Sequence, residues 1–330
     1  MTEVKKHYRS NPHLYRLLAI TVLWMLFMAV TRFDKFYTFK NFQTIAAQFP
    51  EFGLMSLGVM LCMMTGGIDL SCVGVANLTS ILCALLMTKL AGESGVLSPA
   101  TFPIIVVVVL AIGALCGTFS GLLVAKVRIP PILATLGVNE LLTGICMVLT
   151  GGAALSAFPK EMTTMLAANI GGVLPVRLLV FVAMAVLVWF MLCKTTYGTK
   201  LLLLGTSEKV ARYSGMKTER MLIRTYMTSG ICSALGGLMM LSTYASARAD
   251  YGSQYTLQTI LIVVLGGVSP NGGKGKISGV ILAIILLKLL ESGINRFQNI
   301  SSYYISLIWG GVLILAMVMD YVTGDKRSRA

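Results

Sequence analysis

The chain has 330 residues, of which 56% are hydrophobic and only 12% are charged. Soluble domains carry about 25% charged residues, so this composition excludes an ordinary soluble domain and predicts a body solvated by lipid. The net charge of +14 does not indicate a nucleic-acid partner, because the basic residues cluster in short segments between apolar runs, where they set membrane orientation. The seven cysteines form no C-x-x-C pair and the two histidines lie in the N-terminal tail, so we expect no disulfide framework, metal site, cofactor or hydrolase centre.

Apolar runs divide the chain into candidate membrane helices, since a spanning helix needs about 20 mainly apolar residues. We expect an all-α polytopic membrane protein that forms one transmembrane domain over residues 1–330. The eighth run is short and leads into a glycine pair, which predicts a partial or broken helix. Ten spans are predicted, at 14–30, 44–64, 70–90, 103–125, 132–150, 175–193, 221–243, 256–268, 277–294 and 303–322.

Lys and Arg are distributed unequally between the segments that join these spans. If the N-terminus is inside, the cytoplasmic segments hold more than twice as many basic residues as the external ones. This bias predicts that both termini are cytoplasmic, with tails at 1–13 and 323–330, and that the number of spans is even. Two connecting segments are longer than a turn, namely the external segment 151–174 and the cytoplasmic segment 194–220.

A glycine-rich break joins the second and third spans. It contains Gly66, Gly67, Asp69, Ser71 and Gly74. Irregular backbone at membrane depth must be buried in protein, line a cavity or lie at the membrane surface. We expect Asp69 to cap the helix that follows by accepting its free N–H groups. The alternative is a functional carboxylate, because an ionisable residue inside a membrane is a candidate site by default.

Gly266 and Gly267 repeat this pattern in the second half of the chain: an apolar run, a glycine pair, a polar break and a further apolar run. Duplicated halves with matching interruptions are common in transporters; coincidence is the alternative. The segment that follows is rich in Gly and Lys, but it lacks the G-x-x-x-x-G-K-[ST] spacing of a phosphate-binding loop. We therefore expect a transport subunit without enzymatic activity, with any ATP hydrolysis supplied by a separate chain.

Few spans carry polar side chains that suit a sugar. Asn77, Asn139 and Gln258 are the candidates for lining a path. Asp69 and Glu140 are the candidate coupling carboxylates of the alternative function, a self-sufficient proton- or sodium-coupled carrier. For Glu140, a polar contact inside the helix bundle is the simpler expectation.

The cytoplasmic segment 194–220 contains a short predicted helix with an N-cap serine and a glycine stop. A helix of two turns between membrane spans suits a groove on a soluble partner; a solvated surface helix is the alternative. The candidate docking residues are Ser207, Glu208, Lys209, Ala211, Arg212, Tyr213, Ser214 and Gly215.

Four stretches resemble the permease subunits of bacterial ABC sugar importers of the ribose and autoinducer types. They are TGGIDLS at 65–71, IPPILATLG at 129–137, the segment 197–215, and the glycine-rich segment 264–275. Two departures from the usual pattern concern local detail. Cys72 adds one residue before Val73-Gly74, and Thr206-Ser207 replace a glycine and asparagine before the docking helix.

The resemblance implies the type II (vitamin B12-type) importer fold, with about ten helices per subunit. It implies two permease subunits, as a homo- or heterodimer, that form the path and work by alternating access in the bacterial inner membrane. A cytoplasmic ATP-binding subunit would dock at 211–215, and an external sugar-binding protein would deliver the solute. The solute stays open between pentoses, hexoses and sugar-like signals.

Overall fold

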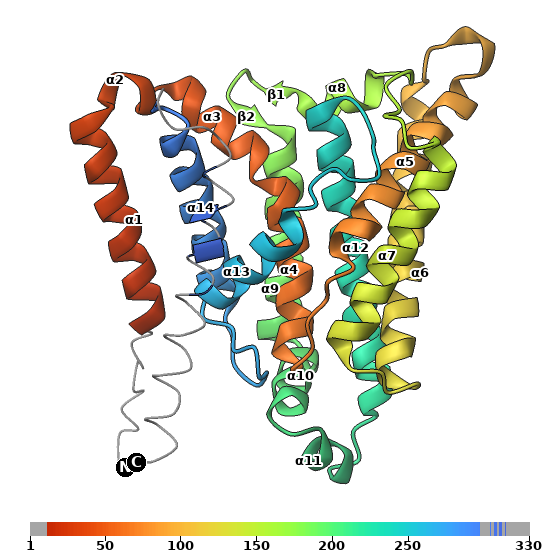
Figure 1. Cartoon of the computed structure of the whole chain (residues 1–330), viewed down its shortest axis with the longest axis vertical. Helices are drawn as coiled ribbons and strands as arrows, with labels where there is room; N and C mark the ends of the chain where they lie inside the picture. Colours follow the sequence, from red (N-terminus) through yellow and green to blue (C-terminus); the bar gives the residue numbers. More distant parts are fainter. Residues whose placement is uncertain (1–11, 298–303, 305–306, 309, 312–313, 315–330) are drawn as a thin grey trace.

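A computed structural model of the chain describes residues 12–297 together with 304, 307–308, 310–311 and 314 (Figure 1). The described part is mostly helical. Its helices are α1 (Pro12–Thr31), α2 (Phe33–Phe36), α3 (Phe39–Gln48), α4 (Pro50–Met64), α5 (Cys72–Ala91), α6 (Phe102–Ala125), α7 (Pro131–Thr150), α8 (Glu161–Ala167), α9 (Val176–Lys194), α10 (Thr196–Thr206), α11 (Glu208–Tyr213), α12 (Thr218–Tyr244), α13 (Tyr255–Leu265) and α14 (Ile277–Ile294), with 3-10 turns at Gly92–Ser94 and Pro99–Thr101.

Long apolar helices confirm the prediction of a polytopic membrane protein. Among the described residues, six helices are long and apolar enough to cross a membrane, or seven if α3 and α4 form one span bent by 42°. The 27 residues of α12 extend about 40 Å, which is also sufficient, although this helix carries more polar residues. The total of ten spans stays a prediction, and the tenth, 303–322, lies almost wholly outside the described residues.

The central helix of the bundle is α12, which packs against α4, α5 and α6. In Figure 1, α1 and α14 lie at one end of the row of helices and α5, α6 and α7 at the other. Small residues allow α6 and α12 to touch through their backbones. A methyl group on Gly117 would lie 2.2 Å from the carbonyl oxygen of Tyr226, and one on Gly113 would lie 2.6 Å from that of Gly230. Such close contact fixes α6 against the central helix α12.

The short helix α13 agrees with the expected partial span. Its 11 residues cover about 16 Å, roughly half of the hydrocarbon thickness. Figure 1 shows it between the two ends of the bundle, obliquely to the long helices. It therefore ends inside the protein, at the second glycine pair.

Three local features differ from the sequence-based expectations. The run predicted as one span at 44–64 is divided at Phe49, because Pro50 begins the new helix α4. The segment 194–220 holds a second helix, α10, before the expected one. The external segment 151–174 contains α8 and the first strand of a two-residue antiparallel hairpin, β1 (Asn169–Ile170) and β2 (Leu174–Pro175), so the fold is not strictly all-α.

Candidate coupling and transport site

The two predicted breaks begin with the same backbone motif. Gly66 and Gly267 follow α4 and α13, and both have φ +83°. After each of them, the next amide donates to the carbonyl five residues earlier at 3.2 Å. This is the Schellman arrangement, in which a left-handed residue, usually glycine, closes a helix. The two breaks thus share a type of helix end, which α7 and α11 also have, and the internal repeat stays a prediction.

Four glycines bring the first break, the second break and α10 together, and we call Gly66, Gly205, Gly272 and Gly273 the glycine junction. The Gly273 N–H donates to the carbonyl oxygen of Met64 at 3.0 Å. A methyl group on Gly205 would lie 2.0 Å from that same oxygen, and one on Gly272 would lie 2.6 Å from the Gly66 nitrogen. Real Cβ atoms do not approach other atoms so closely, so these positions require glycine. The junction therefore joins both breaks to α10 through direct backbone contact.

The short helix α11 has the start predicted from the sequence. The Oγ of Ser207 accepts the N–H of Val210 at 3.3 Å, as an N-cap does. Gly215 follows the helix with φ +79°. Ala211 is fully buried, whereas the side chain of Tyr213 is 90% exposed. The helix thus has an anchored face and a free face that carries a large aromatic ring.

A basic groove lies beside α11. It has a volume of about 590 Å³, and its lining includes Lys200, Lys217, Arg220 and Arg224. On the other side, Arg212 pairs with Glu219 at 3.8 Å, with both side chains about half exposed. The free face of α11 and this groove together form a surface that suits an acidic protein partner with an apolar pocket.

The half-buried phenol of Tyr197 attaches α10 to the bundle. The hydroxyl of Tyr197 lies 2.9 Å from the Oγ1 of Thr225 on α12. Burial raises the pKa of Tyr197, so the phenol stays neutral and keeps a proton for this hydrogen bond. The helix α10 is thereby in direct contact with α12 as well as with the glycine junction.

Asp69 is fully enclosed at the first break and is 2% exposed. Its Oδ1 accepts the N–H of Ser71 at 2.9 Å and the Oγ of Ser71 at 2.6 Å. Its Oδ2 accepts the Oγ of Ser229, on α12, at 2.6 Å. The expected capping role is not seen, because Ser71 is the N-cap residue of α5 and Asp69 accepts none of the N–H groups of the helix itself. Asp69 instead joins the break to the central helix. All three donors are neutral.

The three candidate path-lining residues are occupied by contacts with the protein backbone or are buried. Asn77 is buried, and its Nδ2 donates to the carbonyls of Ala249 at 2.8 Å and Tyr251 at 3.0 Å. Asn139 is half-buried, and its Oδ1 accepts the N–H of Gly74 at 3.0 Å. Gln258 is buried as well. The Oδ1 of Asn77 is buried without a hydrogen-bond partner among the described residues. The place of these three residues on a path stays a prediction.

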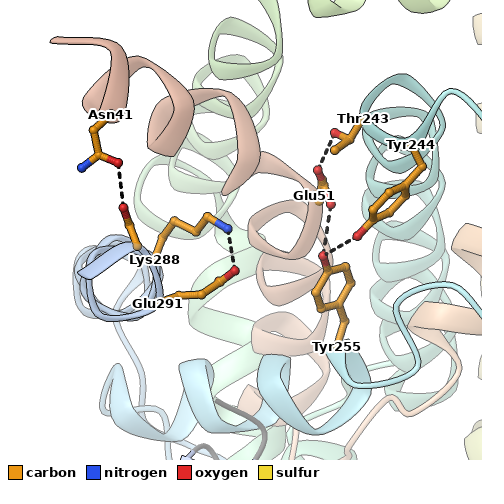
Figure 2. A network of polar contacts seen from close by, with 8 residues as sticks. Asn41, Glu51, Thr243, Tyr244, Tyr255, Lys288 and Glu291 are labelled. Carbon is orange, nitrogen blue, oxygen red and sulfur yellow. Dashed lines mark hydrogen bonds and ion pairs between the residues drawn. The ribbon is translucent and has the colours of Figure 1, made fainter. Parts of the chain in front are cut away.

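A second carboxylate, that of Glu51, was not predicted as a site residue, but it is the centre of a polar network (Figure 2). Glu51, near the start of α4, is 2% exposed. It accepts the hydroxyls of Thr243 and, at 3.1 Å, Tyr255. The hydroxyl of Tyr255 lies 3.1 Å from that of Tyr244. Because these partners are about 200 residues away in the chain, only the tyrosines in and around 244–255 could have hinted at the network.

The Lys288–Glu291 pair on α14 lies to the left of Glu51 in Figure 2, with its charged atoms 3.0 Å apart. The guanidinium of Arg177 donates a hydrogen bond to the hydroxyl of Thr243. The carboxylate of Glu51 is thus held between hydroxyl groups, with positive charges behind them. Such a rigid arrangement inside a membrane protein is typical of functional positions.

The fold defines a class of protein, namely the helical multi-pass membrane proteins. Comparisons with known proteins specify it further. The family described as branched-chain amino acid transport system / permease component matches residues 41–318. The ribose import permease protein RbsC of Escherichia coli K12 is 31% identical over 91% of this chain and 92% of its own length. The autoinducer 2 import system permease protein LsrD of Photorhabdus laumondii is 32% identical over 81% of this chain and 78% of its own.

The chain therefore belongs to this permease family. The resemblance to ribose-type and autoinducer-type permeases, drawn from four short stretches, is confirmed over most of its length. No solved structure matches the chain. Membership identifies a transport subunit rather than an enzyme.

Proposed function

We propose that the chain is the membrane-spanning permease subunit of an ATP-driven, binding-protein-dependent importer of a sugar or sugar-like solute. It would lie in the bacterial inner membrane with both termini cytoplasmic and adopt the type II fold with about ten helices. The names of the relatives support a sugar-like solute. The observation that carries the proposal is the glycine junction, because it links an exposed short helix to both helix breaks without a flexible linker.

The ATP-binding subunit would dock on α11 and on the basic groove beside it. Tyr213 and Val210 offer exposed apolar area, and four cations surround it. A displacement of α11 would pass through α10 to Gly205, and from there to the ends of α4 and α13. The two breaks would then change the outer and inner openings of the path alternately, while an external binding protein supplies the solute.

A second permease subunit would meet the outer face of α7. Glu140 lies halfway along this helix and is exposed, with only a long 3.4 Å hydrogen bond from its neighbour Asn139. A charge at the bilayer centre costs about 3 kcal/mol, so this face is unsuited to lipid. Methyl groups on Gly137 and Gly144 would meet nothing within 4 Å, which leaves room for a close helix. The path would run between the two copies, along Glu140.

The alternative carrier function finds less support in the geometry. A coupling carboxylate must release and rebind its ion, but three neutral donors hold Asp69. Glu140 is open but stands alone on its helix face. We therefore assign energy coupling to the ATP-binding chain.

Co-purification with the ATP-binding subunit tests the docking surface. The double variant Ala211→Pro, Arg212→Glu breaks a short helix, since proline in a helix interior costs about 3 kcal/mol, and reverses a charge on its edge. We expect the permease to stay folded and to lose the ATP-binding subunit. Lys89→Glu, on the membrane helix α5 at the opposite end of the bundle, is the control. Unchanged co-purification of the double variant would contradict the proposed docking site.

A further inference from the structure

The network around Glu51 has a fixed direction. A carboxylate accepts hydrogen bonds and does not donate them, so the single proton of the Tyr255 hydroxyl points to Glu51. The Tyr255 oxygen must then accept a hydrogen bond from the Tyr244 hydroxyl, whose single proton is used in that bond. Thr243 occupies the other oxygen of Glu51. The chain of hydroxyls therefore ends at Tyr244 with a free acceptor oxygen.

Tyr244, which carries this terminal oxygen, is 42% exposed, while Glu51 is enclosed. The hydrogen bond between Tyr244 and Tyr255 lies in an exposed position. Among the described residues, none donates to the Tyr244 hydroxyl. Successive hydrogen bonds polarise one another, so an oxygen at the end of a chain that begins at a carboxylate is a better acceptor than an isolated phenol. The site thus offers a strong acceptor to a donor from outside the protein.

The charged, exposed segment after α12 indicates that Tyr244 faces water rather than lipid. The segment after α12 carries an exposed ion pair, Arg248–Asp250, with 2.9 Å between the charged atoms and about half of each side chain exposed. The ring of Tyr251 lies 5.0 Å from that of Tyr244, tilted by 51°, and its hydroxyl lies 2.9 Å from Ser246. Two tyrosine rings and an acceptor oxygen at a wet surface have the composition of a carbohydrate-contacting site.

We propose that Tyr244 and Tyr251 form a subsite for a polyhydroxylated solute, in which a solute hydroxyl donates to the Tyr244 oxygen and the aliphatic face of the solute packs on the tyrosine rings. Glu51 and Tyr255 are positioning residues that hold Tyr244 as an acceptor. The proposal rests on the proposed function and specifies where a solute contacts this chain. It places the solute contact at the end of α12 rather than at the predicted residues Asn77, Asn139 and Gln258.

The subsite is open and uses one directed hydrogen bond, so its affinity is low. Binding weaker than roughly millimolar suits a path, since conduction requires that a solute leaves as readily as it enters. It also leaves selection among sugars to an external binding protein.

Saturation-transfer NMR on the detergent-purified full chain tests the subsite directly, with D-ribose as the probe. We expect a transfer signal that falls at least threefold in Tyr244→Phe, which keeps the ring and removes the oxygen. Tyr251→Leu, which removes the neighbouring ring, should reduce the signal as well. Tyr15→Phe, at an exposed tyrosine of α1, is the matched control and should retain it. Circular dichroism and gel filtration verify that each variant is folded.

Deoxyriboses separate a direct contact from a general structural effect. In the unmodified chain, at least one of 2-deoxy-, 3-deoxy- and 5-deoxyribose should give a weaker signal than D-ribose. In Tyr244→Phe that analogue and D-ribose should give equal signals, because the interaction they compare has been removed. Absence of any D-ribose signal, or a D-ribose signal in Tyr244→Phe within 1.5-fold of the unmodified chain, would overturn the subsite.

Uptake into vesicles that contain the whole importer is measured in parallel. A Tyr244-dependent signal without ATP-driven uptake would refute the proposed function and leave the subsite standing.

Discussion

The glycine junction can be tested by one added methyl group. In Gly205→Ala the new carbon would lie 2.0 Å from the carbonyl oxygen of Met64 and 2.4 Å from the nitrogen of Gly273. Relief of this overlap requires α10 to move by about 1 Å or more, and such overpacking typically costs about 1–3 kcal/mol. The same movement strains the 3.0 Å hydrogen bond between Gly273 and Met64, and an unsatisfied buried group costs about 1–3 kcal/mol more.

A penalty of about 3 kcal/mol lowers the equilibrium ratio of intact to separated junctions by roughly 100-fold, since each 1.4 kcal/mol is a factor of ten. The free face of α11 is unaffected, so the ATP-binding subunit should still co-purify. ATP-driven uptake into vesicles should nevertheless fall at least tenfold, because docking no longer moves the breaks. The control is Gly310→Ala, where the added methyl group meets none of the described residues within 4 Å.

Uptake by Gly205→Ala equal to that of Gly310→Ala, with an unchanged thermal midpoint, would refute the argument from the close contacts. Loss of both the ATP-binding subunit and uptake would mean that α10 is needed for docking rather than for coupling.

Two further predictions concern the carboxylate at the first break and the contact between copies. Asp69→Asn keeps an oxygen that accepts a hydrogen bond from Ser71 and should retain most of the transport. Asp69→Leu leaves the buried hydroxyl donors of Ser71 and Ser229 without this acceptor, at about 1–3 kcal/mol each, and should lower the thermal midpoint and the yield of folded protein. Full loss of uptake in a well-folded Asp69→Asn would instead favour the carrier function. Gly144→Cys, in a background where the exposed Cys193 is replaced by serine, should form a disulfide-linked dimer in membranes under mild oxidation; a purely monomeric product would contradict an α7 contact between copies.

The features that the sequence predicted correctly are those determined by nearby residues. The ends of α4 and α13 follow from glycine pairs that close a helix, and the start of α11 follows from the hydroxyl of Ser207. The partial span α13 follows from the length of its apolar run. In each case the physical cause lies within a few residues of the feature.

The features that the sequence did not reveal depend on contacts between distant segments. Gly205 looks like an ordinary helical glycine until Met64 and the second break are placed against it. Glu51 follows Pro50 at the start of a helix, where an acidic residue commonly interacts with the helix dipole. Its partners on α12 and α13 become apparent only once the bundle is assembled, because no local pattern records which hydroxyls will face a carboxylate.

The central claim, that this chain is the passive path of an ATP-driven importer, is tested most directly by uptake into vesicles reconstituted from purified parts. The permease is inserted alone, with its ATP-binding subunit, and with that subunit plus the binding protein, and accumulation of radiolabelled D-ribose and other pentoses is followed. We predict accumulation only in the complete system and only with ATP, without an effect of a proton or sodium gradient. Accumulation by the permease alone, driven by an ion gradient, would contradict the account.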